Sequence, residues 1–226
     1  MNILELTACA GYSAASYDDV PDSQKLENRW TSTTFYWLPT EEAHYLIFRG
    51  SQQPRDFLVD AMALPVRYLG TWVHGGFALA HFSVRKKLRK ILGDIEKSGK
   101  PLVVTGHSLG AAQGSLTLLM AHRLYPSIDA RGIFFGKPRV YKKPGRDLFP
   151  DKRVLSCVCG SDVVTRLPRY LFRCESEREQ DMFYLGNDGN NYLNPDMEFV
   201  AEDFSLVDAV SDHSMNTYLQ RLREIQ

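Results

Sequence analysis

Apolar residues recur along the chain with two spacings, one typical of strands and one typical of helices. Short apolar runs predict strands at 30–37, 44–49, 101–105, 132–135, 153–159 and 182–185. Stretches with one apolar face predict helices at 3–17, 77–97, 111–124 and 214–225. Because strands and helices alternate, we expect an α/β fold with a mostly parallel central sheet flanked by helices on both faces.

The predicted helix at 77–97 has two contrasting faces. Phe77, Val84, Leu88 and Ile91 share an apolar side, whereas five cations lie opposite, namely Arg85, Lys86, Lys87, Arg89 and Lys90. A phosphate-binding stripe is one interpretation of these cations. We favour a solvated helix face, because charged residues usually cover the side of a helix that turns away from the core.

Composition narrows the function classes. The chain has 226 residues, of which 44% are hydrophobic and 24% are charged, as in a globular protein. Lys and Arg total 27 and Asp and Glu total 27, so the formal net charge is zero. This balance argues against nucleic acid as a partner and against strong attraction to anionic membranes. No linker or repeat interrupts the pattern, which favours one domain over 1–226, with two domains as the alternative.

Compartment and cysteine usage give further expectations. No apolar run is long enough for a transmembrane segment, and Glu5 stands where a secretory signal would carry basic and then apolar residues. We therefore expect a cytoplasmic protein. The four cysteines are too scattered for a disulfide framework. Cys157 and Cys159 alternate along an apolar run, which favours buried strand positions over a metal site.

The segment Gly106-His107-Ser108-Leu109-Gly110 carries the strongest chemical signal. It follows an apolar strand and precedes a helix, the setting in which G-x-S-x-G places a nucleophilic serine on a sharp turn. The flanking glycines avoid collisions that side chains would make in so tight a turn. The backbone N–H of Leu109 then lies at a helix N-terminus, directed at a developing oxyanion. A plain Gly-rich turn is the alternative.

A nucleophilic serine requires a base, and six histidines are available. His107 lies within the turn itself and His74 precedes the helix at 77–97, and a structural supporting role suits both better than that of the base. His213 precedes the last helix and fits the order serine, acid, histidine. A surface histidine beside a helix N-cap is the alternative.

The carboxylate that orients the base should follow a strand between Ser108 and His213. Asp162 directly follows the apolar run at 153–159 and precedes Val163-Val164, so its carboxylate should be partly buried. A salt-bridged loop residue is the alternative. Other acids occupy the same interval: Asp147, Asp151, Asp181, Asp188, Asp196, Asp203 and Asp208.

Six ordered blocks of the chain resemble the class 3, fungal-type lipases of the α/β-hydrolase superfamily. They are Ile47–Ser51, Asp56–Asp60, Val73–Phe77, Thr105–Ala111, Phe135–Val140 and Asp162–Val164. The resemblance implies an α/β-hydrolase fold with Ser108 as nucleophile, Asp162 as acid and His213 as base. It also implies Ser51 as a second oxyanion-hole residue beside Leu109.

A lid is expected over residues 51–65. The segment is amphipathic and follows Ser51, and the resemblance also places a lid helix there. Phe57, Leu58 and Met62 would contact substrate, and Asp60 would hold Ser51 by a hydrogen bond. The alternative is an ordinary surface helix whose Phe57 and Leu58 stay packed in the core.

Together these observations predict hydrolysis of carboxylic esters, of the acylglycerol or another lipid type, through an acyl-enzyme on Ser108. We expect no metal and no organic cofactor, a lipid or small ester as substrate, and transient contact with a lipid interface. Two alternatives stay open. The first is that the fold serves as a binding module that has lost catalysis, and the second is that the same triad serves an acyltransferase or thioesterase.

Overall fold

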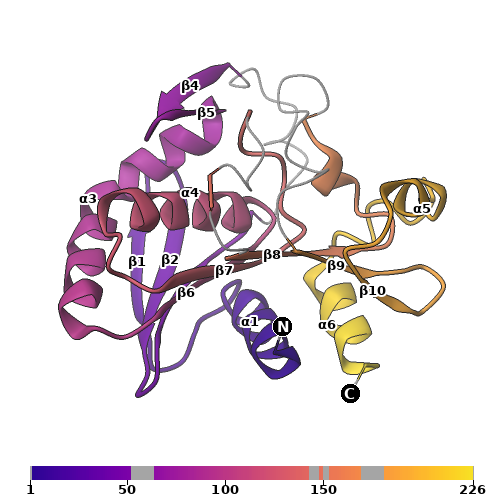
Figure 1. The fold of residues 1–226 in the computed structure, drawn as a ribbon, viewed down its shortest axis with the longest axis horizontal. Coiled ribbons are helices and arrows are strands. Elements are labelled where there is room, and N and C mark those ends of the chain that lie inside the picture. The colour runs from indigo at the N-terminus through magenta and orange to yellow at the C-terminus, as the bar shows by residue number, and fades with distance from the viewer. Residues whose placement is uncertain (1, 52–63, 143–147, 150–152, 169–180, 226) are drawn as a thin grey trace.

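The computed structural model describes residues 2–51, 64–142, 148–149, 153–168 and 181–225. Within these ranges, eight strands form one sheet in the spatial order β1-β2-β3-β6-β7-β8-β9-β10 (Figure 1). The strands are β1 (Gln24–Asn28), β2 (Thr33–Pro39), β3 (His44–Phe48), β6 (Leu102–His107), β7 (Ala130–Phe135), β8 (Val154–Cys159), β9 (Asp181–Leu185) and β10 (Asn191–Leu193). A separate hairpin pairs β4 (Pro65–Tyr68) with β5 (Thr71–His74).

The centre of the sheet is parallel. β3, β6, β7, β8 and β9 run in one direction, while β1, β2 and β10 pair antiparallel at the two sides. All six residues of β6 are buried, as expected for a strand covered on both faces. The mostly parallel sheet predicted from the sequence is therefore confirmed.

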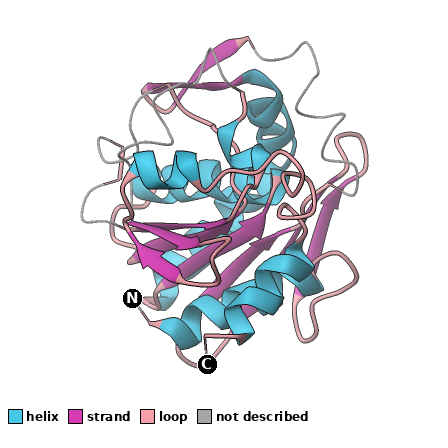
Figure 2. Ribbon diagram, turned by 90° about the vertical axis from the view of Figure 1, so that its right-hand side faces the viewer, coloured by secondary structure: helices cyan, strands magenta, loops and turns pink. Residues whose placement is uncertain are grey.

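Helices cover both faces of this sheet (Figure 2). One face carries α3 (Gly75–Ser98) and α4 (Leu109–Leu124), which share a core cluster with β3 and β6. The other carries α1 (Ile3–Ala15) and α6 (Met215–Arg223), which pack on β6, β7 and β8. The short α5 (Met197–Glu202) and the 3-10 helix η3 (Val163–Arg166) lie beside β8 and β9.

One predicted strand is wrong at its start. Residues 30–37 were expected to be a single strand, but the chain forms a turn before β2 begins at Thr33. The side chain of Asn28 accepts the N–H groups of Trp30 and Thr31, and Ser32 has a φ of 51°. These contacts stabilise a hairpin with β1, whose mixed polar pattern suits an exposed edge strand and gave no apolar run.

The other predicted strands and helices are present with small shifts at their ends. Cys157 and Cys159 are fully buried in β8, as their alternation indicated. In the part of the chain that the structure describes, no helix is long and apolar enough to cross a membrane.

The parallel strands end at a common side of the sheet, here called the catalytic edge. Ser108 follows β6 and Asp162 follows β8 at this edge. Because β2 is antiparallel to β3, the start of β2 lies there too, and the Thr34 carbonyl accepts the N–H of Arg49 over 3.1 Å.

Candidate active site

Ser108 occupies a strained turn between β6 and α4. Its φ of 57° and ψ of −125° lie outside the regions that a serine ordinarily adopts. A Cβ on Gly106 would stand 2.7 Å from the carbonyl carbon of Gly110, and a Cβ on Gly110 would collide with the backbone of Phe48. The two glycines therefore let β3 and the start of α4 approach each other, which directs the Ser108 side chain out of the sheet.

Ser108, His213 and Asp162 form an unbroken hydrogen-bonded chain. The Ser108 hydroxyl lies 2.8 Å from Nε2 of His213, and Nδ1 of His213 lies 2.9 Å from each carboxylate oxygen of Asp162. When Nδ1 carries the proton and donates to Asp162, Nε2 is free to accept the serine proton.

All three side chains of this chain are buried. The exposed fractions are 2% for Ser108, 1% for Asp162 and 6% for His213. Charges separated within such a low-dielectric setting interact more strongly than they do in water. An imidazolium formed on His213 would therefore be stabilised by the adjacent Asp162 carboxylate.

Asp162 is held from two further sides. Oδ1 accepts the N–H of Val164 over 2.9 Å, and Oδ2 accepts the hydroxyl of Tyr218 over 2.7 Å. Burial and the nearby Asp162 charge hold the pKa of Tyr218 well above its usual value, so Tyr218 stays a donor. Tyr218 lies in the predicted helix at 214–225, and no local pattern of the sequence indicates this contact.

His107 supports the backbone of His213. Its Nε2 lies 2.8 Å from the His213 carbonyl, which can only accept, so Nε2 donates and Nδ1 accepts the Tyr17 hydroxyl over 2.7 Å. Burial, followed by the neighbouring His213, lowers the pKa of His107 to about 3. His107 therefore stays neutral and serves as a fixed hydrogen-bonding group.

Gly136 makes room for the acid and the base. It follows β7 with a φ of 54°, and a Cβ there would lie 2.7 Å from Asp162 Oδ2 and 3.0 Å from His213 Nδ1. Any side chain would push these two groups apart. Gly136 belonged to a block of the family resemblance, but this spatial constraint appears only in the structure.

Asp212 anchors the turn that carries His213. Its Oδ2 accepts the N–H of Ser161 over 2.7 Å, and its Oδ1 pairs with Arg221 over 3.1 Å. Arg221 also donates to the carbonyl of Leu185 at the end of β9. These contacts tie the residues beside Asp162 and His213 to the same corner of the fold.

Two sequence-predicted oxyanion residues lie next to the turn. Leu109 is the first residue of α4. Ser51 follows Gly50, and a Cβ added to Gly50 would lie 2.8 Å from the carbonyl oxygen of His107. The chain at Gly50-Ser51 therefore passes close to the nucleophile turn.

His74 and the lid residues have different outcomes. His74 ends β5, is 5% exposed and stacks on Phe77 with ring centroids 4.3 Å apart, while burial lowers its pKa to about 4. It contributes to packing at the start of α3. The remaining predicted lid contacts, Phe57, Leu58, Asp60 and Met62, lie outside the described residues.

Two of the described rival carboxylates, those of Asp203 and Asp188, have other partners. Asp203 accepts the Tyr184 hydroxyl over 2.6 Å and the N–H of Asn187 over 2.8 Å. Asp188 closes its own turn by accepting from Asn190 and Tyr192. Among the described acids, Asp162 is the one that the structure places on His213.

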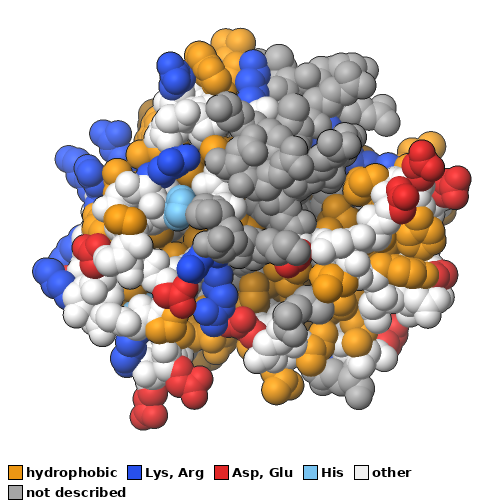
Figure 3. All heavy atoms as spheres, viewed as in Figure 1, with side chains coloured by type: hydrophobic (Ala, Val, Ile, Leu, Met, Phe, Trp, Pro, Cys, Tyr) orange, Lys and Arg blue, Asp and Glu red, His pale blue; other side chains and the backbone are white. Residues whose placement is uncertain are grey.

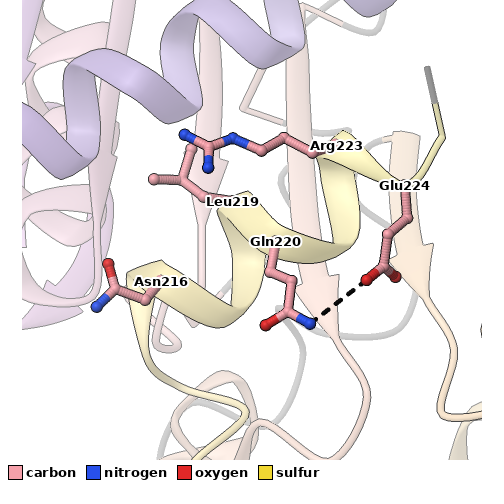
Figure 4. A pocket seen from close by; sticks show the side chains of 5 residues that line it. All are labelled: Asn216, Leu219, Gln220, Arg223 and Glu224. Carbon is pink, nitrogen blue, oxygen red and sulfur yellow. Dashed lines mark hydrogen bonds between the residues drawn. The ribbon is translucent and has the colours of Figure 1, made fainter.

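A hollow on the outer side of α6 is distinct from this site. It is lined by Asn216, Leu219, Gln220, Arg223 and Glu224 (Figure 4). Most of these side chains are exposed, and Gln220 donates to Glu224 over 3.4 Å. The hollow is a shallow depression between exposed side chains of α6. The described residues also contain no cluster of acids, histidines or cysteines suited to a metal ion.

Comparison of the sequence with known protein families gives a match. Residues 45–172, more than half of the chain, match the model of the family described as Lipase (class 3). The chain belongs to the class 3 lipase family. The match includes Ser108 and Asp162, whereas His213 lies beyond it.

Curated relatives match parts of this member of the class 3 lipase family. A lipase of Rhizomucor miehei is 33% identical over 109 residues, which is 45% of this chain and 30% of that protein. Diacylglycerol lipase-alpha of Homo sapiens is 30% identical over 140 residues, which is 53% of this chain and 13% of that protein. The matches thus span less than a third of the length of these relatives.

Solved structures extend the similarity to nearly the whole fold. The triacylglyceride lipase of Rhizomucor miehei superposes with a TM-score of 0.74 and 22% identity, covering 92% of each chain. Lipase II from Rhizopus niveus superposes with a TM-score of 0.77 and 21% identity, covering 93% of this chain and 94% of that one. The predicted α/β-hydrolase fold is confirmed by this similarity.

Proposed function

We propose that this chain is a serine hydrolase of carboxylic esters, with lipid esters as its substrate class. The observation that carries the proposal is the hydrogen-bonded chain from Ser108 through His213 to Asp162. Family membership supports it, because the family is one of lipases. Retention of all three side chains in hydrogen-bonding geometry argues against a binding module that has lost catalysis.

In the proposed reaction, His213 takes the proton of Ser108 as the serine oxygen attacks the acyl carbonyl. Asp162 holds the imidazole with its proton on Nδ1 and stabilises the positive charge that forms. The backbone N–H groups of Ser51 and Leu109 donate to the tetrahedral oxyanion. His213 then protonates the leaving alcohol, and it next activates the water that hydrolyses the acyl-enzyme.

The test is turnover of a short chromogenic ester by the wild-type chain and by Ser108→Ala. We expect a loss of about 10⁴-fold or more in kcat, because only binding and the oxyanion hole remain. Ser211→Ala, an exposed serine near His213, is the matched control and should keep wild-type kcat. Activity of Ser108→Ala above about a tenth of wild type would contradict the assignment.

Two further measurements separate the alternatives and the substrate class. Added alcohols that divert the acyl group from water would favour an acyltransferase, and faster turnover of matched thioesters would favour a thioesterase. A chain-length series of esters, soluble and emulsified, then distinguishes an esterase from a lipase. The lid over residues 51–65 stays a prediction, which the same series tests by an upturn in rate at the solubility limit.

A further inference from the structure

The exposed apolar side chains of this protein are distributed unevenly. Among the large apolar residues that the structure describes, four are more than 70% exposed: Trp30 (87%), Leu64 (73%), Leu206 (83%) and Val207 (90%). Single exposed apolar residues are ordinary on a protein surface. These four share a location, because each lies at the catalytic edge.

The backbone contacts establish this location. Trp30 is in the turn before β2, which starts at the catalytic edge. The last residue of α3, Ser98, is followed by β6, which starts at the side of the sheet opposite the catalytic edge. The first residue of α3, Gly75, therefore lies toward the catalytic edge, and its N–H donates to the Leu64 carbonyl over 3.1 Å. Leu206 and Val207 precede Ala209, whose carbonyl accepts the N–H of Val163, the residue after Asp162.

Trp30 is presented on a braced turn. The side chain of Asn28 donates to the Ser83 carbonyl on α3 over 3.1 Å and accepts the N–H of Trp30 over 3.0 Å. The Thr31 and Ser83 hydroxyls lie 2.7 Å apart. The turn is therefore tied to α3 while the indole itself projects into solvent.

The loop that carries Leu206 and Val207 is braced in a similar way. The N–H of Ser205 donates to the Ser161 hydroxyl over 2.7 Å, and Phe204 lies beneath the Arg166 guanidinium, 4.1 Å from the ring centroid. Both ends of the loop are thus fixed to the segment around Asp162. The two apolar side chains between them turn outward.

Charge indicates what kind of surface these residues contact. Lys and Arg side chains gather over α3, and acidic side chains gather over α5 on the opposite side (Figure 3). Glu202 and Asp208 are exposed on either side of Leu206 and Val207. The positive charge over α3 and the negative charge over α5 offset each other along the catalytic edge. An anionic lipid surface would attract one side and repel the other, so the edge suits an uncharged or zwitterionic lipid surface better.

We propose that Trp30, Leu64, Leu206 and Val207 form a lipid-docking rim, which seats the catalytic edge on the surface of a neutral lipid aggregate. The rim is built from described residues, of which Leu64 lies within the segment 51–65 where a lid is expected and the other three lie outside it. Indole rings favour the boundary between lipid and water. Leucine and valine side chains lower the free energy when their apolar surface is removed from water. The proposal rests on the proposed function for its purpose, since it places Ser108 next to lipid esters.

The experiment measures binding rather than turnover. Ser108→Ala serves as the parent, so that lipid is not hydrolysed, and the probe is vesicles of phosphatidylcholine containing dioleoylglycerol. In this parent, Trp30→Ser and the double change Leu206→Ser with Val207→Ser should each lower vesicle partitioning about tenfold. Leu4→Ser, which removes a 70% exposed leucine from α1, is the matched control and should bind like the parent.

Tryptophan fluorescence gives an independent readout. The emission of the parent should shift to shorter wavelength when vesicles are added, because the Trp30 indole leaves water. Trp30→Phe should keep most of the binding and lose most of the shift. Exchanging phosphatidylcholine for phosphatidylserine should change partitioning by less than about threefold, because the charges offset.

Several results would overturn the docking rim. These are a parent that does not bind, rim variants that bind as well as Leu4→Ser, or a strong preference for anionic vesicles. Failure of the proposed function is a different result: the wild type would not cleave esters, whereas Ser108→Ala would still bind vesicles through the rim. In Ser108-containing protein, Trp30→Ser should keep wild-type kcat on a soluble acetate ester.

Discussion

The hydroxyl of Tyr218 on α6 donates to Oδ2 of Asp162 over 2.7 Å. The same hydroxyl accepts the N–H of Cys159, the last residue of β8, over 3.1 Å. Tyr218 is fully buried, so both hydrogen bonds form away from water. One side chain thus joins the final helix, the end of a strand and the carboxylate that contacts His213.

Tyr218→Phe removes both of these hydrogen bonds and keeps the ring. We expect kcat to fall about tenfold with little change in KM, because Asp162 loses a partner that holds it against His213. The free energy of unfolding should fall by about 1–3 kcal/mol. Kinetics on a soluble ester and urea unfolding measure the two effects. Tyr184→Phe, whose hydroxyl contacts Asp203 and the Gly160 carbonyl, is the control and should lower stability alone.

Asp162→Asn should lower kcat by about 10⁴-fold, because an amide nitrogen facing Nδ1 favours the imidazole tautomer with its proton on Nε2. Asp203→Asn is the matched substitution at a carboxylate that contacts Tyr184 instead of His213. It should keep kcat within a few-fold of wild type. Inactive Asp203→Asn beside active Asp162→Asn would show that the orienting carboxylate is misassigned.

Gly136→Ala should abolish ester turnover although it replaces no triad residue. The new methyl group would lie 2.7 Å from Asp162 Oδ2 and 3.0 Å from His213 Nδ1, at a φ that disfavours alanine. We expect kcat to fall by at least about a hundredfold, since a small misplacement of reacting groups has effects of this size. Gly93→Ala, on α3 with open space around its Cβ, should leave kcat unchanged.

Stability should decrease as the pH falls below neutrality, partly through His81. Burial, followed by the charge of Arg85, lowers the pKa of His81 from 6.5 to about 3. Between these values the unfolded chain binds a proton that the folded protein does not bind. The contribution of neutral His81 to the free energy of unfolding is therefore complete above pH 6.5, and it is lost progressively as the pH falls toward 3.

Urea unfolding of the wild type and His81→Gln between neutral pH and pH 4 measures this contribution. Gln retains a partner for the Tyr68 hydroxyl, which lies 2.9 Å from His81 Nε2. Below about pH 6 the slope of unfolding free energy against pH should be smaller in His81→Gln by about 1.4 kcal/mol per pH unit, the value for one proton. Parallel slopes would mean that His81 takes up a proton in the folded state.

Much of the fold follows from local pattern. The apolar runs of β6 and β7 and the amphipathic face of α3 predicted their elements, since burial requires a matching period of apolar residues. The pattern failed at Trp30, where the Asn28 side chain stabilises a turn within a stretch that is rich in strand-forming residues.

The sequence by itself determined the nucleophile turn and the choice of candidate residues. The strand, the two glycines around Ser108 and the helix are contiguous, so steric requirements within one short segment point to this geometry. Asp162 and His213 were selectable because the first follows a predicted strand, and because chain order left few candidates for the second.

Only the tertiary structure decided what holds those residues in place. Tyr218 contacts Asp162, His107 contacts the backbone of His213, and Gly136 leaves space for both side chains. None of these contacts joins neighbours in the chain, and a tyrosine or glycine at such a position has no local pattern that predicts its partner. The docking rim has the same origin, because its members are brought to one edge by the strand directions of the sheet.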